Sequence, residues 1–280
     1  MKKIILLAIS ALIFAGCTTI NEGRRLHSFR KSFHYKTYRF GSEKAAKRAV
    51  AEYNKIGSVP LDRETAHALF GILWLIADKS DYSFIEADLV KATSTNENKI
   101  LALGLQSIAL SKMDCPGLAR AHYNELKTSL SIQRLSNPNH VGVERQMMLI
   151  SLIAVSLYQD DLDFAKRNAD TLCTSSQLDY ITPLLGAVIE AKKGNPLKAM
   201  EQLQKLSQND KFSEPKKKLF SESADMIKDC PEEELLGQEL VDRLILQLVK
   251  GALDDIFSDE NQQAFLKNVM IFAKPFTVEK

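Results

Sequence analysis

The sequence predicts an all-α protein built as an array of helical hairpins. From Ser42 onward, apolar residues recur every three or four positions, the spacing of one face of an α-helix. Sustained apolar–polar alternation and the Asn-Gly or Asp-Gly pairs typical of β-hairpins are missing. Two helical hairpins also repeat at a spacing of 34 residues. These observations favour stacked hairpins over a fold that contains a sheet.

The composition is that of a folded protein with no strong charge. Of 280 residues, 45% are hydrophobic and 26% are charged, so a substantial core is possible. The chain carries 37 basic and 35 acidic residues. A near-neutral balance argues against nucleic-acid binding, which needs a basic surface.

Residues 1–16 have the layout of a secretory signal peptide. Lys2 and Lys3 precede an apolar run over 4–15, and the small residues Ala15 and Gly16 come directly before Cys17. The run is too short to cross a bilayer, which takes roughly 20 residues. An ordinary signal peptide that happens to end near a cysteine is the alternative interpretation.

The ending Phe14-Ala15-Gly16-Cys17 resembles the lipobox of bacterial lipoproteins, although Phe14 stands where the family usually has Leu. The resemblance implies a diacylglyceryl group on the Cys17 sulfur, cleavage before Cys17, and acylation of the new amine, commonly by palmitate. Thr18 in the next position implies delivery to the outer membrane, with the periplasmic face expected and the cell surface left open.

Residues 17–41 are expected to form a basic tether between the lipid and the folded domain. They lack clean periodicity and carry six basic residues against one acid, Glu22. Basic residues beside an anchor are attracted to anionic lipid head groups. The candidate membrane-proximal residues are Arg24, Arg25, Arg30 and Lys31. A solvated spacer is the alternative.

The helical array is expected over 42–210. Ser42 is a candidate cap for its first helix, which Gly57 ends, and Asp62 is a candidate cap for the second. The second helix is apolar almost all round over 69–77, so it should be buried. Further helices are expected over 82–92, 96–113 and 116–130, followed by a turn at 136–139.

The next two hairpins carry the repeat. Helices over 143–158 and 162–172 align with helices over 180–193 and 197–206, which places Ala165 opposite Ala199 and Asp160 opposite Gly194. This resembles the tetratricopeptide repeat, which has a 34-residue helix–turn–helix period. The family's aromatic and proline positions are mostly absent, and the resemblance covers about 70 residues. It implies an α-solenoid with a curved protein-binding face.

Aromatic and arginine side chains on such a face are the usual interface anchors. The candidates are Tyr123, Tyr158, Tyr180 and Arg145, which are equally compatible with ordinary buried positions.

Residues 211–280 are expected to be helices that cap the array. The stretch 232–257 is the longest helical pattern, with a stripe formed by Leu236, Leu240, Leu244 and Leu248. Its wide apolar face should close the end of the solenoid, because stacked repeats need a terminal cap. Docking of a partner or of a second copy is the alternative.

Motifs for catalysis, metals and cofactors are missing. The sequence has no HExxH, GxSxG, GxGxxG or Walker motif, and no CxxC. We therefore expect no enzyme activity and no cofactor. Cys115, Cys173 and Cys230 allow one disulfide in an exported protein, and the sequence leaves the pairing open.

The sequence as a whole indicates a lipid-anchored scaffold or assembly adaptor that binds other envelope proteins. One alternative is an enzyme, or an accessory subunit, of peptidoglycan or glycan metabolism. Another is a binding module for a lipid or glycan in a groove lined by Trp74. Two carboxylates in a deep pocket would favour the enzyme, and a closed apolar cavity would favour the lipid carrier. The partner and the oligomeric state are left open.

Overall fold

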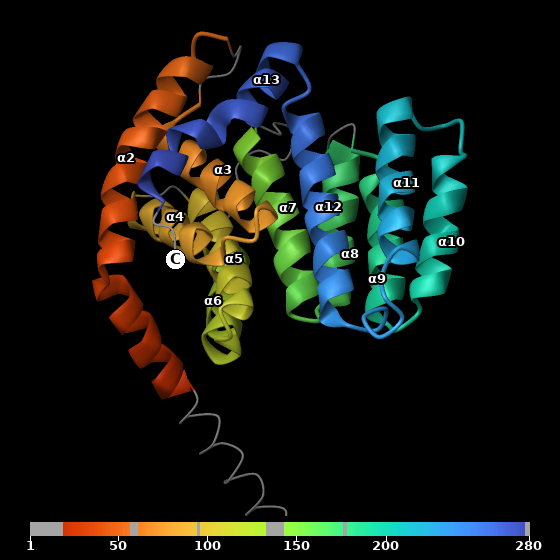
Figure 1. The fold of residues 1–280 in the computed structure, drawn as a ribbon, viewed down its shortest axis with the longest axis horizontal. Coiled ribbons are helices and arrows are strands. Elements are labelled where there is room, and N and C mark those ends of the chain that lie inside the picture. The colour runs from red at the N-terminus through yellow and green to blue at the C-terminus, as the bar shows by residue number, and fades with distance from the viewer. Residues whose placement is uncertain (1–18, 57–60, 94–95, 133–142, 176–177, 278–280) are drawn as a thin grey trace, which may run out of the picture. The chain divides into compact units, whose positions relative to one another are not determined.

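The computed structural model describes residues 19–56, 61–93, 96–132, 143–175 and 178–277. Every regular element in these ranges is a helix, and the all-α prediction is confirmed (Figure 1). The chain divides into two compact units. Unit 1 comprises residues 1–134 and 264–280, and unit 2 comprises residues 135–263.

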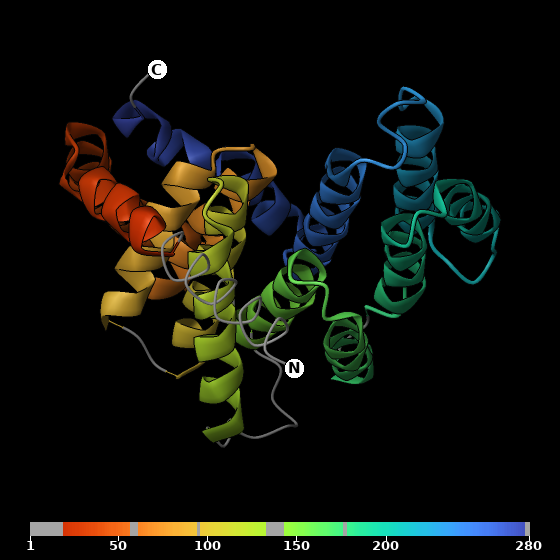
Figure 2. The ribbon, with the colours of Figure 1, turned by 90° about the horizontal axis from the view of Figure 1, so that it is seen from below.

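Unit 1 begins with a helical segment over 19–31. Five helices follow it: α2 (Phe33–Tyr53), α3 (Arg63–Ile76), α4 (Ser80–Thr93), α5 (Asn96–Lys112) and α6 (Pro116–Ile132). Each helix from α3 to α6 packs on the next. The unit is completed by two short turns from the far end of the chain, η1 (Val269–Phe272) and η2 (Lys274–Phe276), which pack on α2 and are deep blue beside it in Figure 2.

The structure corrects the expected start of the first helix. Ser42 does not cap it, because α2 begins nine residues earlier, where the Ser32 hydroxyl accepts a hydrogen bond from the Tyr35 N–H at 3.1 Å. Gly41 lies inside α2, and a Cβ on it would clash with the ring of Phe276. Gly41 therefore permits close packing of η2, and the described part of the expected tether, 19–41, is helical.

Unit 2 contains α7 (Val143–Tyr158), α8 (Leu162–Ser175), α9 (Ile181–Lys192), α10 (Pro196–Ser207), α11 (Glu214–Lys228) and α12 (Gln238–Ile256). Residues 257–259 connect α12 to α13 (Glu260–Asn268), whose first four residues belong to unit 2 and whose remaining residues belong to unit 1. The aligned residues Ala165 and Ala199 are both fully buried between helices.

Helix α12 differs from its expected position at the end of an array. It begins at Gln238, so Leu236 lies outside it and is 74% exposed. The rest of its stripe, Leu240, Leu244 and Leu248, is buried. Helix α12 packs on α7 and α9, the first helices of both hairpins, as well as on α11. Its apolar face thus packs against the side of the hairpins that α7 and α9 form.

Four hairpin turns share one backbone geometry. The residues Asp78, Asp114, Asp160 and Gly194 all have positive φ, between 55° and 80°. After each of them, the next N–H donates to the carbonyl five residues earlier, at 2.8–3.0 Å. This is the helix-ending geometry that glycine adopts most readily and that aspartate tolerates. The last two turns match the 34-residue alignment, whereas the first two follow no regular spacing by which they could be found in the sequence.

Candidate functional site

Unit 1 contains a half-open cavity of about 1150 Å³, which we call the aromatic cavity. Its walls come from the segment 19–31, α2, the α3–α4 turn, the end of α5 and η2. The lining residues include the rings of Phe29, His34, Trp74 and Tyr82, and the charged side chains of Asp78, Asp81, Lys79, Lys112 and Lys274. Rings with a few polar groups at the edge are typical of a small-molecule site.

The rings of the aromatic cavity pack on one another. The ring centroid of Tyr82 lies 4.9 Å from that of His34 and 5.1 Å from that of Trp74. His34 Nε2 lies 3.1 Å from Asp81 Oδ2, and Lys112 Nζ lies 3.0 Å from Asp78 Oδ1. The second of these contacts is an ion pair that joins the end of α5 to the α3–α4 turn.

A buried polar cluster lies next to the aromatic cavity, centred on the carboxylate of Glu86. The hydroxyls of Tyr38 and Ser42 both donate to Glu86 Oε1, the latter at 2.7 Å, and His67 Nδ1 lies 2.7 Å from Oε2. The indole N–H of Trp74 donates to the Tyr38 hydroxyl. Burial, and then the charge of Glu86, raise the pKa of Tyr38 well above its usual range.

The Glu86 cluster contains the residue types of a nucleophilic triad without the geometry of one. In a triad the serine bonds to one imidazole nitrogen and the carboxylate to the other. Here Ser42 donates to the carboxylate and lies 3.3 Å from the same Nδ1, whereas Nε2 lies 3.9 Å from Glu43. Ser42 and Glu86 are 0% exposed and His67 is 2% exposed. The cluster therefore joins α2, α3 and α4 in the interior of unit 1 and is closed to solvent.

The residues expected to form a basic arm belong to a docked helix. Arg30 donates to both oxygens of Asp88, at 2.9 and 2.7 Å, and Tyr35 and Gln106 donate to the same carboxylate. Arg25 donates to the Asp114 carbonyl at 3.3 Å. Arg24 and Lys31 are exposed.

Glu22 ties the same segment to α6. It is only 7% exposed and accepts hydrogen bonds from the backbone N–H groups of Gly117 and Leu118, at 3.2 and 2.7 Å. A carboxylate at a helix N-terminus satisfies unpaired donors and suits the helix dipole. The segment 19–31 is thus attached at both its beginning and its end.

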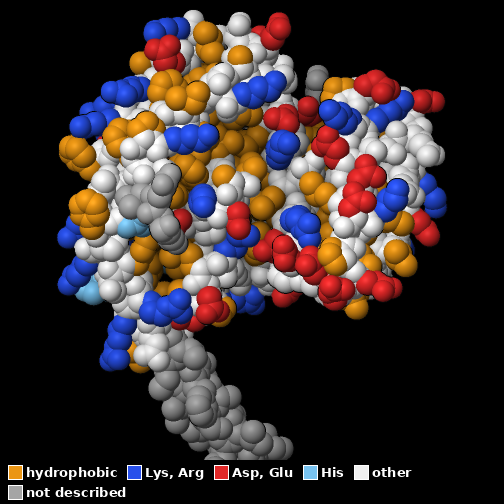
Figure 3. Space-filling view, viewed as in Figure 1, with side chains coloured by type: hydrophobic (Ala, Val, Ile, Leu, Met, Phe, Trp, Pro, Cys, Tyr) orange, Lys and Arg blue, Asp and Glu red, His pale blue; other side chains and the backbone are white. Residues whose placement is uncertain are grey.

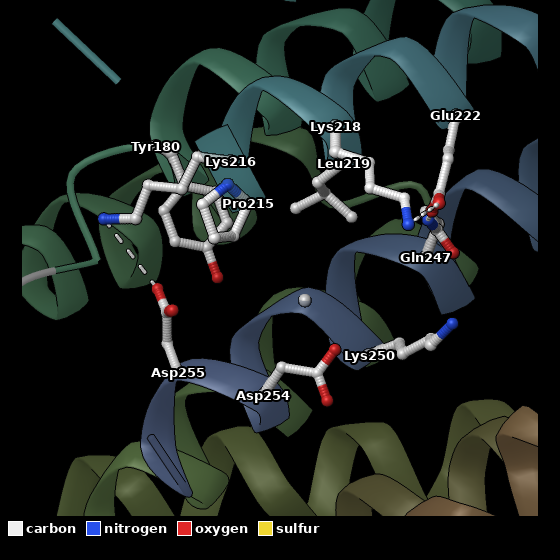
Figure 4. A pocket seen from close by; sticks show the side chains of 11 residues that line it. Tyr180, Pro215, Lys216, Lys218, Leu219, Glu222, Gln247, Lys250, Asp254 and Asp255 are labelled. Atoms are coloured by element: carbon white, nitrogen blue, oxygen red, sulfur yellow. Dashed lines mark hydrogen bonds and ion pairs between the residues drawn. The ribbon is translucent and has the colours of Figure 1, made fainter. Parts of the chain in front are cut away.

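Unit 2 has a smaller cavity of about 260 Å³ between α9, α11 and α12 (Figure 4). Asp255 extends from α12 toward Lys216 and Tyr180, whereas Asp254 points away from them, toward Lys250. Burial is the main cause that raises the pKa of Asp255, while the nearby Lys216, 3.9 Å away, opposes it. Burial, followed by the charge of Asp255, also raises the pKa of Tyr180.

Most of the expected interaction face is not accessible. Tyr123 and Tyr180 are each 1% exposed and Arg145 is 9% exposed, so these side chains offer almost no surface to a partner. Tyr158 is partly exposed. An aromatic residue on a helix has the same sequence signature whether it faces a partner or the protein's own core. Here Tyr123 and Tyr180 face the core.

The three cysteines left open by the sequence are free thiols. Cys17 lies outside the described residues, so the structure does not bear on its modification. Within the described ranges, no group of three His, Cys, Asp or Glu side chains is arranged to hold a metal ion. No helix in the same part of the chain is long and apolar enough to span a bilayer.

Comparison with known proteins gives no relative: no family model, no curated protein and no solved structure matches this chain.

Proposed function

We propose that the chain is a lipid-anchored envelope protein whose helical hairpins hold another envelope protein close to the membrane. The proposal takes the anchor from the signal peptide and the lipobox-like ending at Cys17. It takes the docking role from the surface of unit 2.

The observation that carries the docking role is a pair of exposed leucines at one end of unit 2. Leu197, in the first turn of α10, is 62% exposed, and Leu236 is 74% exposed. A Cβ on Gly194, in the α9–α10 turn, would lie 3.9 Å from Leu236 Cδ2, so Leu236 lies beside this turn. Exposed apolar side chains that gather at one place favour a protein-contact site. Because α12 covers the side of the hairpins, the proposed contact lies at their end.

Site-specific photo-crosslinking in living cells tests the proposal. A photoreactive amino acid at position 197 or 236 should give a discrete crosslinked product with an envelope protein. The same group at Lys205, exposed on α10, is the control and should give none. Cys17→Ser should move the chain out of the membrane fraction and abolish the product.

Two results would contradict the proposal. Equal products from positions 197, 236 and 205 would mean that the leucines are not a contact site. Membrane association and acylation unchanged by Cys17→Ser would refute the anchor.

The aromatic cavity supports a second candidate function, the binding of a glycan or another ring-bearing ligand. Its size fits a small molecule, and its rings offer stacking surfaces beside polar groups. The enzyme alternative rests on the two carboxylates Asp254 and Asp255, which line the small cavity of unit 2, whereas the Glu86 cluster is closed to solvent.

A further inference from the structure

We propose that the outward face of α2 lies against the anionic leaflet of a membrane, beside the lipid anchor. This membrane face is defined by Phe33, Lys36, Phe40, Lys44 and Lys47. It deepens the proposed function and rests on it for the anchor, but the contact itself belongs to the folded protein and is measurable without lipid on Cys17.

The two phenylalanines are conspicuous because the fold does not bury them. Phe33 is 77% exposed and Phe40 is 68% exposed, although each lies in a helix whose opposite side is fully packed. They are seven residues apart, so they share one side of α2. Folding leaves the apolar surface of both rings in water. Moving the rings out of water, into a bilayer or an interface, would therefore be favourable.

Lysines alternate with these rings along the same side. At 100° per residue, the five residues of the membrane face fall within about 80° of the helix circumference. Lys36, Lys44 and Lys47 are all exposed, and Lys44 Nζ lies 4.4 Å from the centroid of the Phe40 ring. Hydrophobic and basic side chains accordingly alternate along the edge of unit 1 that α2 forms in Figure 3.

The charged side chains of the segment 19–31 and the first part of α2 are mostly basic. Residues 19–48 contain nine basic side chains and two acidic ones, Glu22 and Glu43. Glu22 is buried against α6, and Glu43 lies 3.3 Å from Arg63 of α3. The surface therefore complements anionic head groups, to which each basic residue adds roughly 1 kcal/mol of attraction.

The pattern fits a bilayer better than a protein partner. The centres of protein interfaces are depleted in lysine, because its ammonium group is costly to desolvate. At a membrane, aromatic rings enter the boundary between head groups and acyl chains, while lysines extend their stems along it and keep their charge in water.

The docked segment 19–31 places this face near the proposed anchor. Its contacts through Glu22 and Arg30 fix it to α6 and α4, and it leads into α2 with only Ser32 between the two helices. Only Thr18 separates Cys17 from residue 19 in the sequence, and an extended chain spans at most about 3.5 Å per residue. A lipid on Cys17 would therefore keep unit 1 at the bilayer surface.

Vesicle binding by the unlipidated mature chain tests the proposal. The protein would be residues 17–280 with Cys17→Ser, which keeps every residue that the structure describes. Phe40→Trp supplies a reporter, because the only native tryptophan, Trp74, is 5% exposed. Emission of the new tryptophan should shift to the blue with vesicles of phosphatidylcholine and phosphatidylglycerol, and should not shift with phosphatidylcholine alone.

Matched substitutions, followed by vesicle sedimentation, separate the two contributions. Changing Lys36, Lys44 and Lys47 together to Gln should weaken binding about 100-fold, which is about 3 kcal/mol. Phe33→Ser with Phe40→Ser should weaken it at least about tenfold. The controls are Lys205, Lys211 and Lys228 changed to Gln, and Leu197→Ser with Leu236→Ser, all exposed sites of unit 2 that should leave binding unchanged.

The result that overturns the proposal is an emission spectrum unaffected by anionic vesicles, or equal losses in the α2 variants and in the unit 2 controls. Either would leave the anchor untouched, because acylation of Cys17 is measured separately by metabolic labelling of the full chain. Normal vesicle binding by a chain that is never acylated would refute the anchor instead and keep the membrane face.

Discussion

At the scale of single residues, the most informative position is Ser42. A serine after Gly41 and before an apolar run reads as a helix start, because capping signals are local. The structure uses the same serine in the middle of α2 as a buried donor to Glu86, 44 residues further along. Sequence reasoning missed this because nothing in a single sequence shows which distant partner makes a buried polar group tolerable.

Replacement of that serine tests its buried role. Ser42→Ala removes one donor from a carboxylate that water does not reach, and should lower the free energy of unfolding by about 1–3 kcal/mol. Urea denaturation measures the change. Ser28→Ala, at an exposed site in the segment 19–31, gives the same gain in helix propensity without the lost bond. If Ser42→Ala and Ser28→Ala had the same free energy of unfolding, the hydrogen bond from Ser42 to Glu86 would make no net contribution to stability.

At the scale of elements, the sequence predicts the long apolar helices, but it does not predict that the segment 19–31 is a helix docked through polar contacts. Helix α3 was expected to be buried nearly all round, and ten of its residues are buried. The segment 19–31 packs through charged side chains such as Glu22 and Arg30, so it lacks the apolar stripe that reveals a docked helix. Its basic residues therefore suggested a solvated tether.

The contact between α2 and α4 predicts a distinct alkaline pH dependence. Burial, and then the charge of Asp88, raise the pKa of Tyr35 to about 12, from an unfolded value of about 10. A group whose pKa is higher in the folded state stabilises the fold below its unfolded pKa, and this contribution is lost as pH rises through the folded value. The expected loss between pH about 10 and about 12 is about 2 kcal/mol.

Tyr35→Phe isolates this contribution. The variant cannot ionise at this position, so its stability relative to the native chain should rise across that interval, as measured by urea titrations at each pH. A constant difference from neutral pH upward would show that Tyr35 does not couple to alkaline unfolding.

At the scale of the whole molecule, four hairpin turns share one backbone geometry but are separated by unequal numbers of residues. The interval of 34 residues between Asp160 and Gly194 is visible in the sequence, whereas Asp78 and Asp114 fall outside any common period. A repeat search depends on constant spacing, so it finds unit 2 and misses the matching turns of unit 1. No local pattern in the sequence indicates the division into two units or the return of residues 264–280 to the first unit.

The free thiols predict the response of the molecule to redox conditions. The sequence allowed one disulfide, but Cys115 and Cys230 are buried as thiols and Cys173 Sγ donates to the Leu178 carbonyl at 3.0 Å. The thermal unfolding midpoint should therefore be the same with and without reductant. In the chain with Cys17→Ser, three thiols should react in denaturant without prior reduction, and Cys115 should be slow in the folded protein, because burial raises its pKa.

A midpoint that falls on adding reductant, or a single reactive thiol in denaturant, would contradict this expectation. A variant with Cys173→Ser serves as the control, since it should lower the thiol count by one without creating any sensitivity to reductant.

The packing of Phe276 on Gly41 has a consequence for how the protein is made. A chain that is synthesised or exported from its amino end completes α2 early, yet the turns that cover α2 follow the whole of unit 2 in the sequence. Until residues 269–276 have been delivered, the strip of α2 around Gly41 is therefore uncovered. A chain cut short before residue 269 would leave this strip of unit 1 permanently exposed to water.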